Sequence, residues 1–219
     1  MGLDIYFKKT TVQFHGDPSN TEDFNNFCNE ADKAASDGLR DKVRKLLKPL
    51  REAWVNLQTN DYWRNIYNER YFTFVEQLRP LIAKNYDWKI YPFTKQILDF
   101  PELEKQIDEE VKDYYLQYDA YFRKVNFLFA YYENQGKMVE QYYAFTDRED
   151  IDDIISRCER VLADHKLASE LLPTQAGFFF GSTDYDDYYF DDVKDCLNQM
   201  KKYRKLLTDG VTGFVIFSW

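Results

Sequence analysis

The sequence predicts a helix-rich α+β fold with a small antiparallel or mixed sheet that includes both chain termini. The first observation is an alternation of apolar and polar residues at the N-terminus, where Leu3, Ile5 and Phe7 share one face of an expected strand. The second is an apolar run at residues 214–219, which closes the chain as another expected strand. Between these ends, apolar residues recur mainly at helical spacing, and only 8 Gly and 6 Pro interrupt 219 residues. We therefore expect helices to cover a sheet built from distant parts of the chain.

With 219 residues, the chain is long enough for one large domain with a substantial core. We expect a single domain over residues 1–219. Its core is expected to combine residues 1–14 with residues 99–219, and residues 15–98 are expected to form a helical insertion. Aromatic residues make up 18% of the chain, a share that opposes disorder and favours a packed interior.

The expected insertion starts with a loop at residues 15–20, where turn-forming residues follow one another. Asn20 or Thr21 can then cap a short helix. Gly38 is expected to end this helix, because glycine is common just after helix C-termini. A short helix is therefore expected between these two signals.

Two further helices are expected in the insertion. Residues 39–57 place leucine, valine and tryptophan on one face, with a kink at Pro49. Residues 63–81 repeat the helical spacing after Asn60, which can cap the helix. Basic residues of the first of these helices lie mainly off its apolar face, where they can either meet water or dock an acidic partner.

The helical spacing of apolar residues ends at residues 86–93, which predict a loop or a short strand. Such a strand is expected at the edge of a sheet, because Pro92 cannot donate a ladder hydrogen bond. The longest helix of the chain is expected next, with Pro101 in its first turn. Its apolar residues keep helical spacing over residues 103–132, and residues 134–136 end it. We expect this helix to be the central helix of the fold.

A second internal pattern predicts a strand followed by a helix. The strand is expected at residues 139–145, and the apolar face of the helix runs over residues 151–162. Thr146 and Glu149 have the spacing of a capping box at the start of this helix.

The densest pattern lies at residues 171–190, which predict a short strand that turns into a helix. Glycines bracket three phenylalanines at residues 178–180, and strand geometry places the first and third on one face. The following helix is expected to start at Asp184, with Thr183 as its cap, and to continue to Leu207.

The formal charge of −9 is concentrated in one part of the chain. Residues 99–195 hold 24 acidic and 10 basic side chains, whereas the rest of the chain holds 14 acidic and 19 basic ones. An acidic segment repels a phosphate backbone. We therefore expect no direct nucleic-acid binding and instead a protein partner with a basic surface. A charged face that only meets water is the structural alternative.

The cysteine count and the N-terminus indicate the compartment. Cys28, Cys158 and Cys196 form no close pair and no metal-ligand spacing, and an odd number opposes a disulfide framework. Cys158 and Cys196 lie on apolar helix faces, where we expect inert core thiols. The N-terminus lacks the features of a signal peptide, and no apolar run approaches bilayer length. A cytoplasmic protein with no membrane partner is therefore expected.

Four blocks of the sequence carry a family resemblance. They are Met-Gly-Leu-Asp-Ile-Tyr at residues 1–6, Tyr-Phe-Arg-Lys-Val-Asn at residues 121–126, Leu-Leu-Pro-Thr-Gln-Ala-Gly-Phe-Phe-Phe-Gly-Ser-Thr-Asp-Tyr-Asp at residues 171–186, and the closing Ser-Trp. Together they resemble a family of uncharacterised phage and bacterial proteins, although Phe122 stands where that family typically has Trp. The resemblance implies a mobile-element origin and no established activity, so it assigns no catalytic residue.

Candidate binding residues gather where the expected strand turns into the last helix. They are Ser182, Thr183, Asp184, Tyr185, Asp186, Asp187 and Tyr188. Helix N-termini can bind anions, but the carboxylates at this one oppose a phosphate. A ligand here is instead expected to present a cation, an amine or a metal ion. The alternative is structural, with Thr183 as the cap and the acids stabilising the first turn.

Other chemical signatures are weak. A second acidic helix start at residues 147–153 can converge with the first on a divalent ion, although the spacing matches no known loop. His15 and His165 have no nucleophile or second ligand at motif spacing. We therefore predict no catalytic residue, no metal-ligand set and no cofactor.

Two functions from different classes stay open. The first is a non-enzymatic binding or inhibitory protein that presents its acidic, tyrosine-rich C-terminal half to a basic partner. The second is a small-molecule or nucleotide binder or hydrolase that uses a pocket at the strand-to-helix turn, with a divalent metal or a carboxylate base. A homo-oligomeric structural protein is a third alternative.

Overall fold

The computed structural model describes residues 2–17, 19–57, 63–82, 100–112, 116–140 and 142–219. The chain forms two compact units, which are described separately. Met1–Ala31 and Gln117–Trp219 form the sheet unit, and Asp32–Leu116 form the helical unit. The helical unit has limits different from those of the expected insertion at residues 15–98, and the expected single domain stays a prediction.

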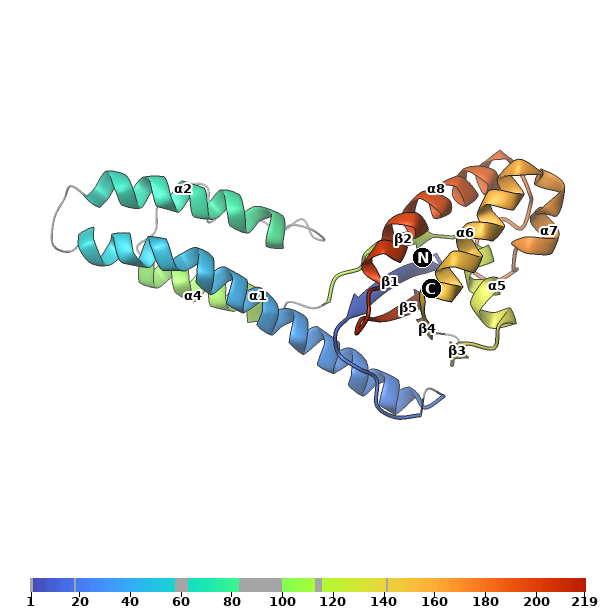
Figure 1. The fold of residues 1–219 in the computed structure, drawn as a ribbon, viewed down its shortest axis with the longest axis horizontal. Coiled ribbons are helices and arrows are strands. Elements are labelled where there is room, and N and C mark those ends of the chain that lie inside the picture. The colour runs from blue at the N-terminus through green and yellow to red at the C-terminus, as the bar shows by residue number, and fades with distance from the viewer. Residues whose placement is uncertain (1, 18, 58–62, 83–99, 113–115, 141) are drawn as a thin grey trace. The chain divides into compact units, whose positions relative to one another are not determined.

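Within the described ranges, five antiparallel strands form the sheet, in the order β2-β1-β5-β4-β3. They are β1 (Asp4–Thr10), β2 (Ala120–Arg123), β3 (Met138–Val139), β4 (Tyr143–Thr146) and β5 (Thr212–Ser218). The two terminal strands lie side by side, paired from Asp4 opposite Ser218 to Thr10 opposite Thr212 (Figure 1). The predicted fold class is confirmed: a helix-rich α+β fold whose antiparallel sheet contains both terminal strands.

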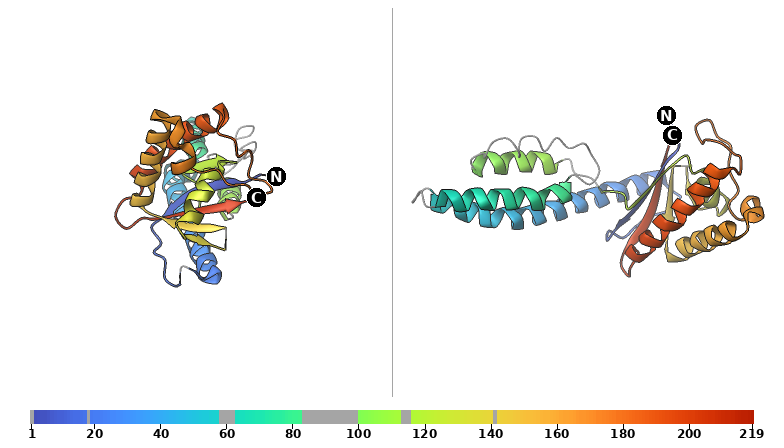
Figure 2. Two further views of the ribbon diagram at one scale, coloured as in Figure 1. Left: turned by 90° about the vertical axis from the view of Figure 1, so that its right-hand side faces the viewer. Right: turned by 90° about the horizontal axis from the view of Figure 1, so that it is seen from above.

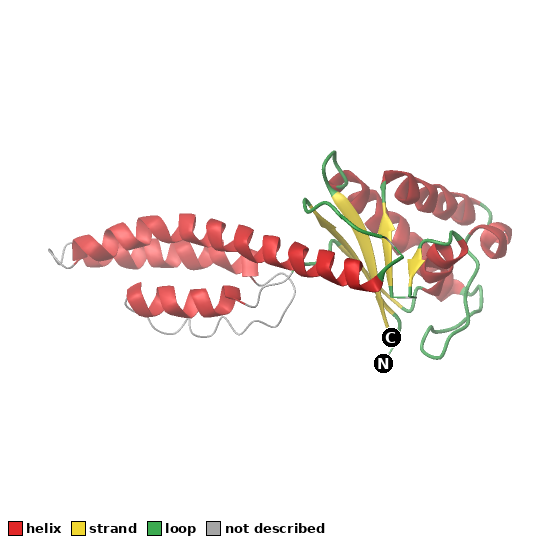
Figure 3. Ribbon diagram, turned by 90° about the horizontal axis from the view of Figure 1, so that it is seen from below, coloured by secondary structure: helices red, strands yellow, loops and turns green. Residues whose placement is uncertain are grey.

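Helices cover one face of this sheet (Figure 3). They are α5 (Asn126–Asn134), α6 (Arg148–Ala163) and α8 (Asp187–Tyr203), accompanied by the short η1 (His165–Leu167), α7 (Ala168–Leu171) and η2 (Arg204–Leu206). Leu3, Ile5 and Phe7 are fully buried, as their alternation predicted, and the Phe7 ring packs 5.4 Å from the ring of Tyr203 on α8. Burying each such side chain contributes roughly 1.5–3 kcal/mol, so the N-terminal strand is a central part of the core.

The opposite face of the sheet is covered by the first turns of α1 (Thr21–Leu57). Phe24 stacks on Tyr143 of β4 with ring centroids 4.4 Å apart, and Phe27 packs edge-on against Phe214 of β5 at 5.2 Å. Both phenylalanines are almost fully buried. The sheet therefore packs against apolar side chains on each of its two faces.

The expected helix end at Gly38 is wrong, because α1 continues from Thr21 to Leu57. A glycine inside a helix costs about 1 kcal/mol relative to alanine, and the burial of neighbouring side chains outweighs this cost. Ala31 before the glycine and Leu39 after it are both buried, so the apolar faces of the two expected helices join. The helix also continues through Pro49.

The helical unit consists of the rest of α1 with α2 (Trp63–Ile82) and α4 (Phe100–Lys112), which lie side by side (Figure 2). The helix expected at residues 63–81 is confirmed by α2. A separate apolar core holds the three helices together, and its most deeply buried members include Leu50, Tyr71 and Leu103. The expected cap at Asn60 and the expected loop or strand at residues 86–93 lie outside the described residues.

The expected long helix over residues 103–132 is wrong, because β2 interrupts it. The described part of α4 ends at Lys112, and Ala120–Arg123 pairs with β1. Lys124 then has a left-handed backbone, with φ 61°, before α5 begins. The local spacing suited a helix, but pairing with the edge of β1 satisfies the backbone groups of this segment and decides its structure.

The single strand expected at residues 139–145 is instead a hairpin of β3 and β4. The expected capping box is shifted by one residue, because Asp147 caps α6 and exchanges hydrogen bonds with Asp150. Thr146 is buried, and its Oγ1 accepts a hydrogen bond from the Tyr132 hydroxyl at 2.7 Å. The helix α6 itself lies where the apolar face predicted it.

The outer edge of β2 is closed by a side chain of α8. Gln199 Oε1 accepts a hydrogen bond from the Tyr121 N–H at 3.2 Å, and Gln199 Nε2 donates to the Tyr121 carbonyl at 3.1 Å. One side-chain amide thus takes the place of a neighbouring strand. Unpaired strand edges otherwise invite pairing with another chain, so Gln199 protects this edge.

Gln199→Ala is expected to lower the free energy of unfolding by about 1–2 kcal/mol, because a backbone donor and a backbone acceptor lose their partner. The freed edge is also expected to promote self-association at high protein concentration. Urea denaturation and light scattering measure these two effects. Gln135, an exposed residue at the end of α5, provides the control Gln135→Ala. Equal behaviour of the two variants contradicts the prediction.

Candidate functional site

The seven predicted site residues form one exposed surface where the loop after α7 enters α8. They are Ser182, Thr183, Asp184, Tyr185, Asp186, Asp187 and Tyr188, and all are exposed. Tyr188 has 81% of its surface exposed, whereas Tyr185 packs against Tyr189 with ring centroids 4.9 Å apart. None of the seven lines the cavity of about 880 Å³ in the sheet unit.

The three phenylalanines before this surface form a turn and not the expected strand. Phe180 is buried against Phe129 and Trp219, at ring-centroid distances of 4.8 and 5.6 Å, whereas Phe178 is 91% exposed. The expectation that Phe178 and Phe180 share one face is therefore wrong. Gly181 follows with φ +93°, a left-handed conformation that redirects the chain and that other residues rarely adopt.

The turn is anchored by Asn126, a buried residue at the start of α5. Its Nδ2 donates to the carbonyls of Ser182 and Phe180 at 2.8 and 3.3 Å. Its Oδ1 accepts a hydrogen bond from the Gln175 N–H at 3.4 Å. A single amide thus holds three backbone groups of the loop against the core.

Two further hydrogen bonds tie the loop to its surroundings. The Leu3 N–H donates to the Phe179 carbonyl at 3.0 Å, next to the exposed Phe178. The Thr174 hydroxyl donates to the Thr183 carbonyl at 2.9 Å, which joins the two ends of the loop. Phe178 therefore projects into solvent from a backbone that is bonded on both sides of it.

The helix α8 begins at Asp187, and its cap is Asp186 rather than the expected Thr183. Asp186 Oδ1 accepts a hydrogen bond from a backbone N–H of the first turn at 3.0 Å. The Ser182 hydroxyl has a local role as well, because it accepts a hydrogen bond from the Asp184 N–H at 3.0 Å. Ser182 and Asp186 thus serve the fold, and the carboxylates of Asp184 and Asp187 are available for other contacts.

The acidic residues of α6 and α8 differ in how they are neutralised. Four acidic residues of α6 each pair with a lysine or arginine: Asp150, Asp152, Asp153 and Glu159. At the start of α8, four carboxylates have no ion-pair or hydrogen-bond partner in the part of the chain that the structure describes: Asp184, Asp187, Asp191 and Asp192. We call these last four residues the acidic surface.

The acidic surface carries an electrostatic cost. The pKa of Asp192 is raised from 3.8 to about 6, first by desolvation and then by the charges of Asp195, Asp191 and Asp186. The first turns of α8 thus hold several negative charges close together. A cationic group from outside the chain would relieve this repulsion.

Asp192→Asn is expected to raise the free energy of unfolding by about 1 kcal/mol at neutral pH, a value that allows for the solvent screening of a partly exposed carboxylate. Because the pKa in the folded protein exceeds the ordinary value, the folded state holds this proton more tightly than the unfolded chain does. The stability that the proton contributes is complete below pH 3.8 and is lost as the pH rises through about 6. The gain from the substitution should therefore disappear in acid.

Urea denaturation across this pH range measures the effect of Asp192→Asn. Asp184→Asn, which removes the same charge from the exposed loop, is the control. A gain in stability that is the same at every pH contradicts the assignment to Asp192.

Three other chemical predictions concern metal ions, histidine and cysteine. Among the residues described, no group of three or more His, Cys, Asp or Glu side chains is placed to hold a metal ion. His165 stacks on Phe190 with ring centroids 3.7 Å apart. Cys158 and Cys196 are fully buried, as their positions on apolar faces predicted, and burial raises the pKa of the Cys196 thiol.

Known proteins provide no assignment for this geometry. No family model, no curated protein and no solved structure matches this chain. The resemblance to phage and bacterial proteins therefore stays a hypothesis based on its four sequence blocks. None of the helices in the described part of the chain is long and apolar enough to cross a membrane.

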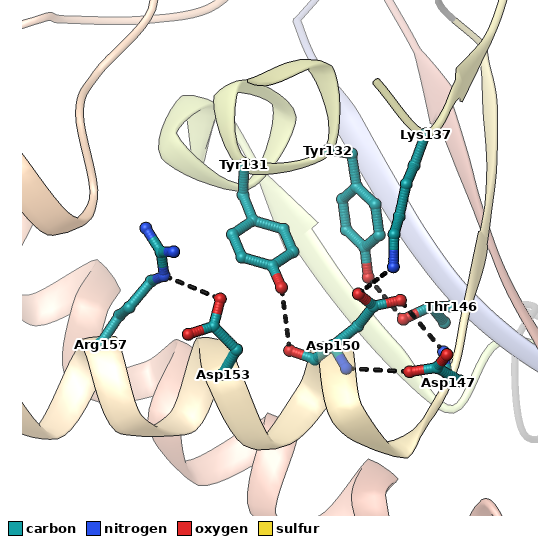
Figure 4. Close-up of polar contacts among 8 residues, drawn as sticks. All are labelled: Tyr131, Tyr132, Lys137, Thr146, Asp147, Asp150, Asp153 and Arg157. Atoms are coloured by element: carbon teal, nitrogen blue, oxygen red, sulfur yellow. Dashed lines mark hydrogen bonds and ion pairs between the residues drawn. The ribbon is translucent and has the colours of Figure 1, made fainter. Parts of the chain in front are cut away.

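Sequence reasoning missed a polar network at the start of α6, which Figure 4 shows. The Lys137 ammonium donates to the carboxylate of Asp150, a residue only 6% exposed. The Tyr131 hydroxyl donates to the Asp150 carbonyl at 3.3 Å. The acidic run at residues 147–153 was a signal for this site, but its basic and aromatic partners come from α5 and the turn after it. No sequence spacing indicates that these segments meet.

Proposed function

We propose that this chain is a non-enzymatic binding protein that engages and inhibits a basic protein partner. The contact surface combines the acidic surface with the exposed aromatic side chains of Phe178 and Tyr188. A phage or mobile-element origin and a cytoplasmic location belong to the same proposal. They rest on the sequence blocks and on the presence of three free cysteines.

The observation that carries this proposal is the exposure of Phe178 on an anchored loop. A phenylalanine that is 91% exposed contributes little to the core, and its burial in a partner is favourable by roughly 2 kcal/mol. An aromatic side chain on a backbone that is already held loses little conformational entropy when it binds. Such residues are typical of the energetic centres of protein interfaces.

Charge selects the kind of partner. Tyr188 lies one helical turn before Asp191 and Asp192, so an apolar contact and negative charges are presented together. Lysine and arginine side chains of a partner would complement carboxylates that lack partners within the described chain. The same charges oppose a nucleic-acid backbone. A small-molecule or nucleotide site at this turn is less well supported, because the turn does not line the 880 Å³ cavity.

A photoreactive phenylalanine analogue in place of Phe178 tests the proposal. It is expected to crosslink one basic protein from the native host, and that protein, once purified, should bind strongly at low salt and weakly at high salt. A triple variant with Asp184→Asn, Asp187→Asn and Asp191→Asn keeps the cap residue Asp186. We expect it to weaken binding about tenfold.

A control variant removes three charges from other exposed positions, through Glu30→Gln, Glu69→Gln and Glu76→Gln. It should bind the partner as the wild type does. Affinity that is independent of salt, or an equal loss in both triple variants, contradicts the proposal. A crosslink between two copies of this chain would instead support the homo-oligomeric alternative.

A further inference from the structure

The cavity of about 880 Å³ lies in the sheet unit, between the start of α6, the β3–β4 hairpin and the segment that leads into β5. Its volume falls within the range of about 300–1,000 Å³ that is typical of small-ligand sites. Apolar side chains line part of its wall: Met138, Val139, Phe145, Leu207 and Val211. The cavity can therefore hold the apolar body of a small organic molecule.

Both cationic side chains of the wall are already engaged. The Lys137 ammonium pairs with the buried carboxylate of Asp150 (Figure 4). The Arg148 Nε donates to the Leu207 carbonyl. The Lys137 charge is therefore neutralised, whereas Arg148 keeps its positive charge and is held in place by a neutral carbonyl group.

The carboxylates of the wall are more numerous, and two of them are open. Asp147 and Asp150 are engaged by the capping box of α6, which also satisfies the positive end of that helix. Glu149 and Asp209 line the same cavity, and in the described part of the chain their carboxylates have no ion-pair or hydrogen-bond partner. Four acids against two bases give the wall a negative balance.

We propose that this cavity binds a small organic cation, with an ammonium group placed toward Glu149 and Asp209 and an apolar body packed against the apolar part of the wall. The combination of apolar walls, engaged cations and open carboxylates favours this class of ligand over an anion of the same shape. The site is separate from the acidic surface of α8, and it goes beyond the proposed function because it needs no protein partner.

Three probes of similar shape and different charge test the proposal on the full-length chain. They are phenethylamine, which is cationic, 2-phenylethanol, which is neutral, and phenylacetate, which is anionic. Isothermal calorimetry and amide chemical shifts are expected to show saturable binding of phenethylamine, with shifts at residues that line the cavity. Phenylacetate that binds as tightly as phenethylamine would overturn the proposal, and so would the absence of saturable binding by phenethylamine.

Variants locate the binding site. The double variant Glu149→Gln and Asp209→Asn preserves side-chain shape and is expected to weaken phenethylamine binding about tenfold. Asp184→Asn, which removes a charge from the acidic surface of α8, should leave the affinity unchanged. Thermal unfolding checks that both variants are folded. Equal weakening by the double variant and by Asp184→Asn would show a nonspecific response to net charge and would reject the cavity as the site.

Discussion

Gly213→Ala is expected to lower the free energy of unfolding of the sheet unit by about 3 kcal/mol. A Cβ atom at this position would lie 2.6 Å from the Thr146 carbonyl oxygen, 2.9 Å from Leu207 Cδ2 and 3.0 Å from the Tyr203 hydroxyl oxygen. Thr146 lies opposite Gly213 in the β4–β5 ladder, so its carbonyl cannot move away without loosening the strand pairing. Urea denaturation monitored by circular dichroism measures the loss.

The matched control is Gly38→Ala in α1, where an added Cβ atom meets nothing within 4 Å. Alanine has a higher helix propensity than glycine, so this variant should raise the free energy of unfolding by about 0.5–1 kcal/mol. The same substitution thus has opposite effects at the two sites. A Gly213→Ala protein as stable as the wild type would contradict the close approach of β4 and β5.

Asn126→Leu is expected to lower the free energy of unfolding by about 2–3 kcal/mol, because it leaves one buried and two partly buried backbone groups without their partner. Leucine has nearly the shape of asparagine but can neither donate to the carbonyls of Phe180 and Ser182 nor accept from the Gln175 N–H. The loop that carries Phe178 should then separate from α5. Urea denaturation measures the stability, and hydrogen exchange of residues 175–182 measures the release of the loop.

Asn198→Leu is the control, because it makes the same substitution at an exposed position of α8. It should leave the free energy of unfolding and the hydrogen exchange of the loop almost unaltered. Faster exchange in both variants, or in neither, contradicts the anchoring role of Asn126. If the proposed function is correct, Asn126→Leu should also weaken partner binding, because Phe178 then loses its fixed position.

The two proposed sites in the sheet unit can be tested independently. The acidic surface at the start of α8 and the cavity at the start of α6 share no residue. Partner binding depends on Asp184 and its neighbours, whereas cation binding depends on Glu149 and Asp209. Failure of one experiment therefore leaves the other proposal standing.

Periodic patterns were sufficient to predict several elements of this protein. β1, β5, α2 and α6 lie where apolar spacing placed them, because each buries a continuous apolar face that is visible within one segment. The seven candidate residues at the start of α8 lie together for a simpler reason, since they are consecutive in the chain, and their role in binding stays a prediction. The charge of this region is likewise a property of one segment.

Other features depend on partners far away in the chain. The apolar spacing around β2 predicts a helix, and only its pairing with β1 identifies it as a strand. Asn126 has no motif of its own, yet it binds carbonyls 54 and 56 residues later. Gly38 carries a helix-ending signal that the buried side chains around it outweigh. In each case, a long-range contact outweighs a local preference.

The sequence by itself determined the fold class, the presence of both terminal strands in one sheet, and the acidic character of the C-terminal half. These properties follow from side-chain periodicity and from charge along the chain. Only the tertiary structure decided that four carboxylates of α6 are paired with lysine or arginine, whereas those of the acidic surface have no such partner in the described part of the chain. It also decided that Phe178 is exposed and Phe180 is buried, and that a cavity is lined by Glu149 and Asp209. The physical reason is that ion pairs, hydrogen bonds and cavities depend on distances between side chains from separate elements, which no local pattern records.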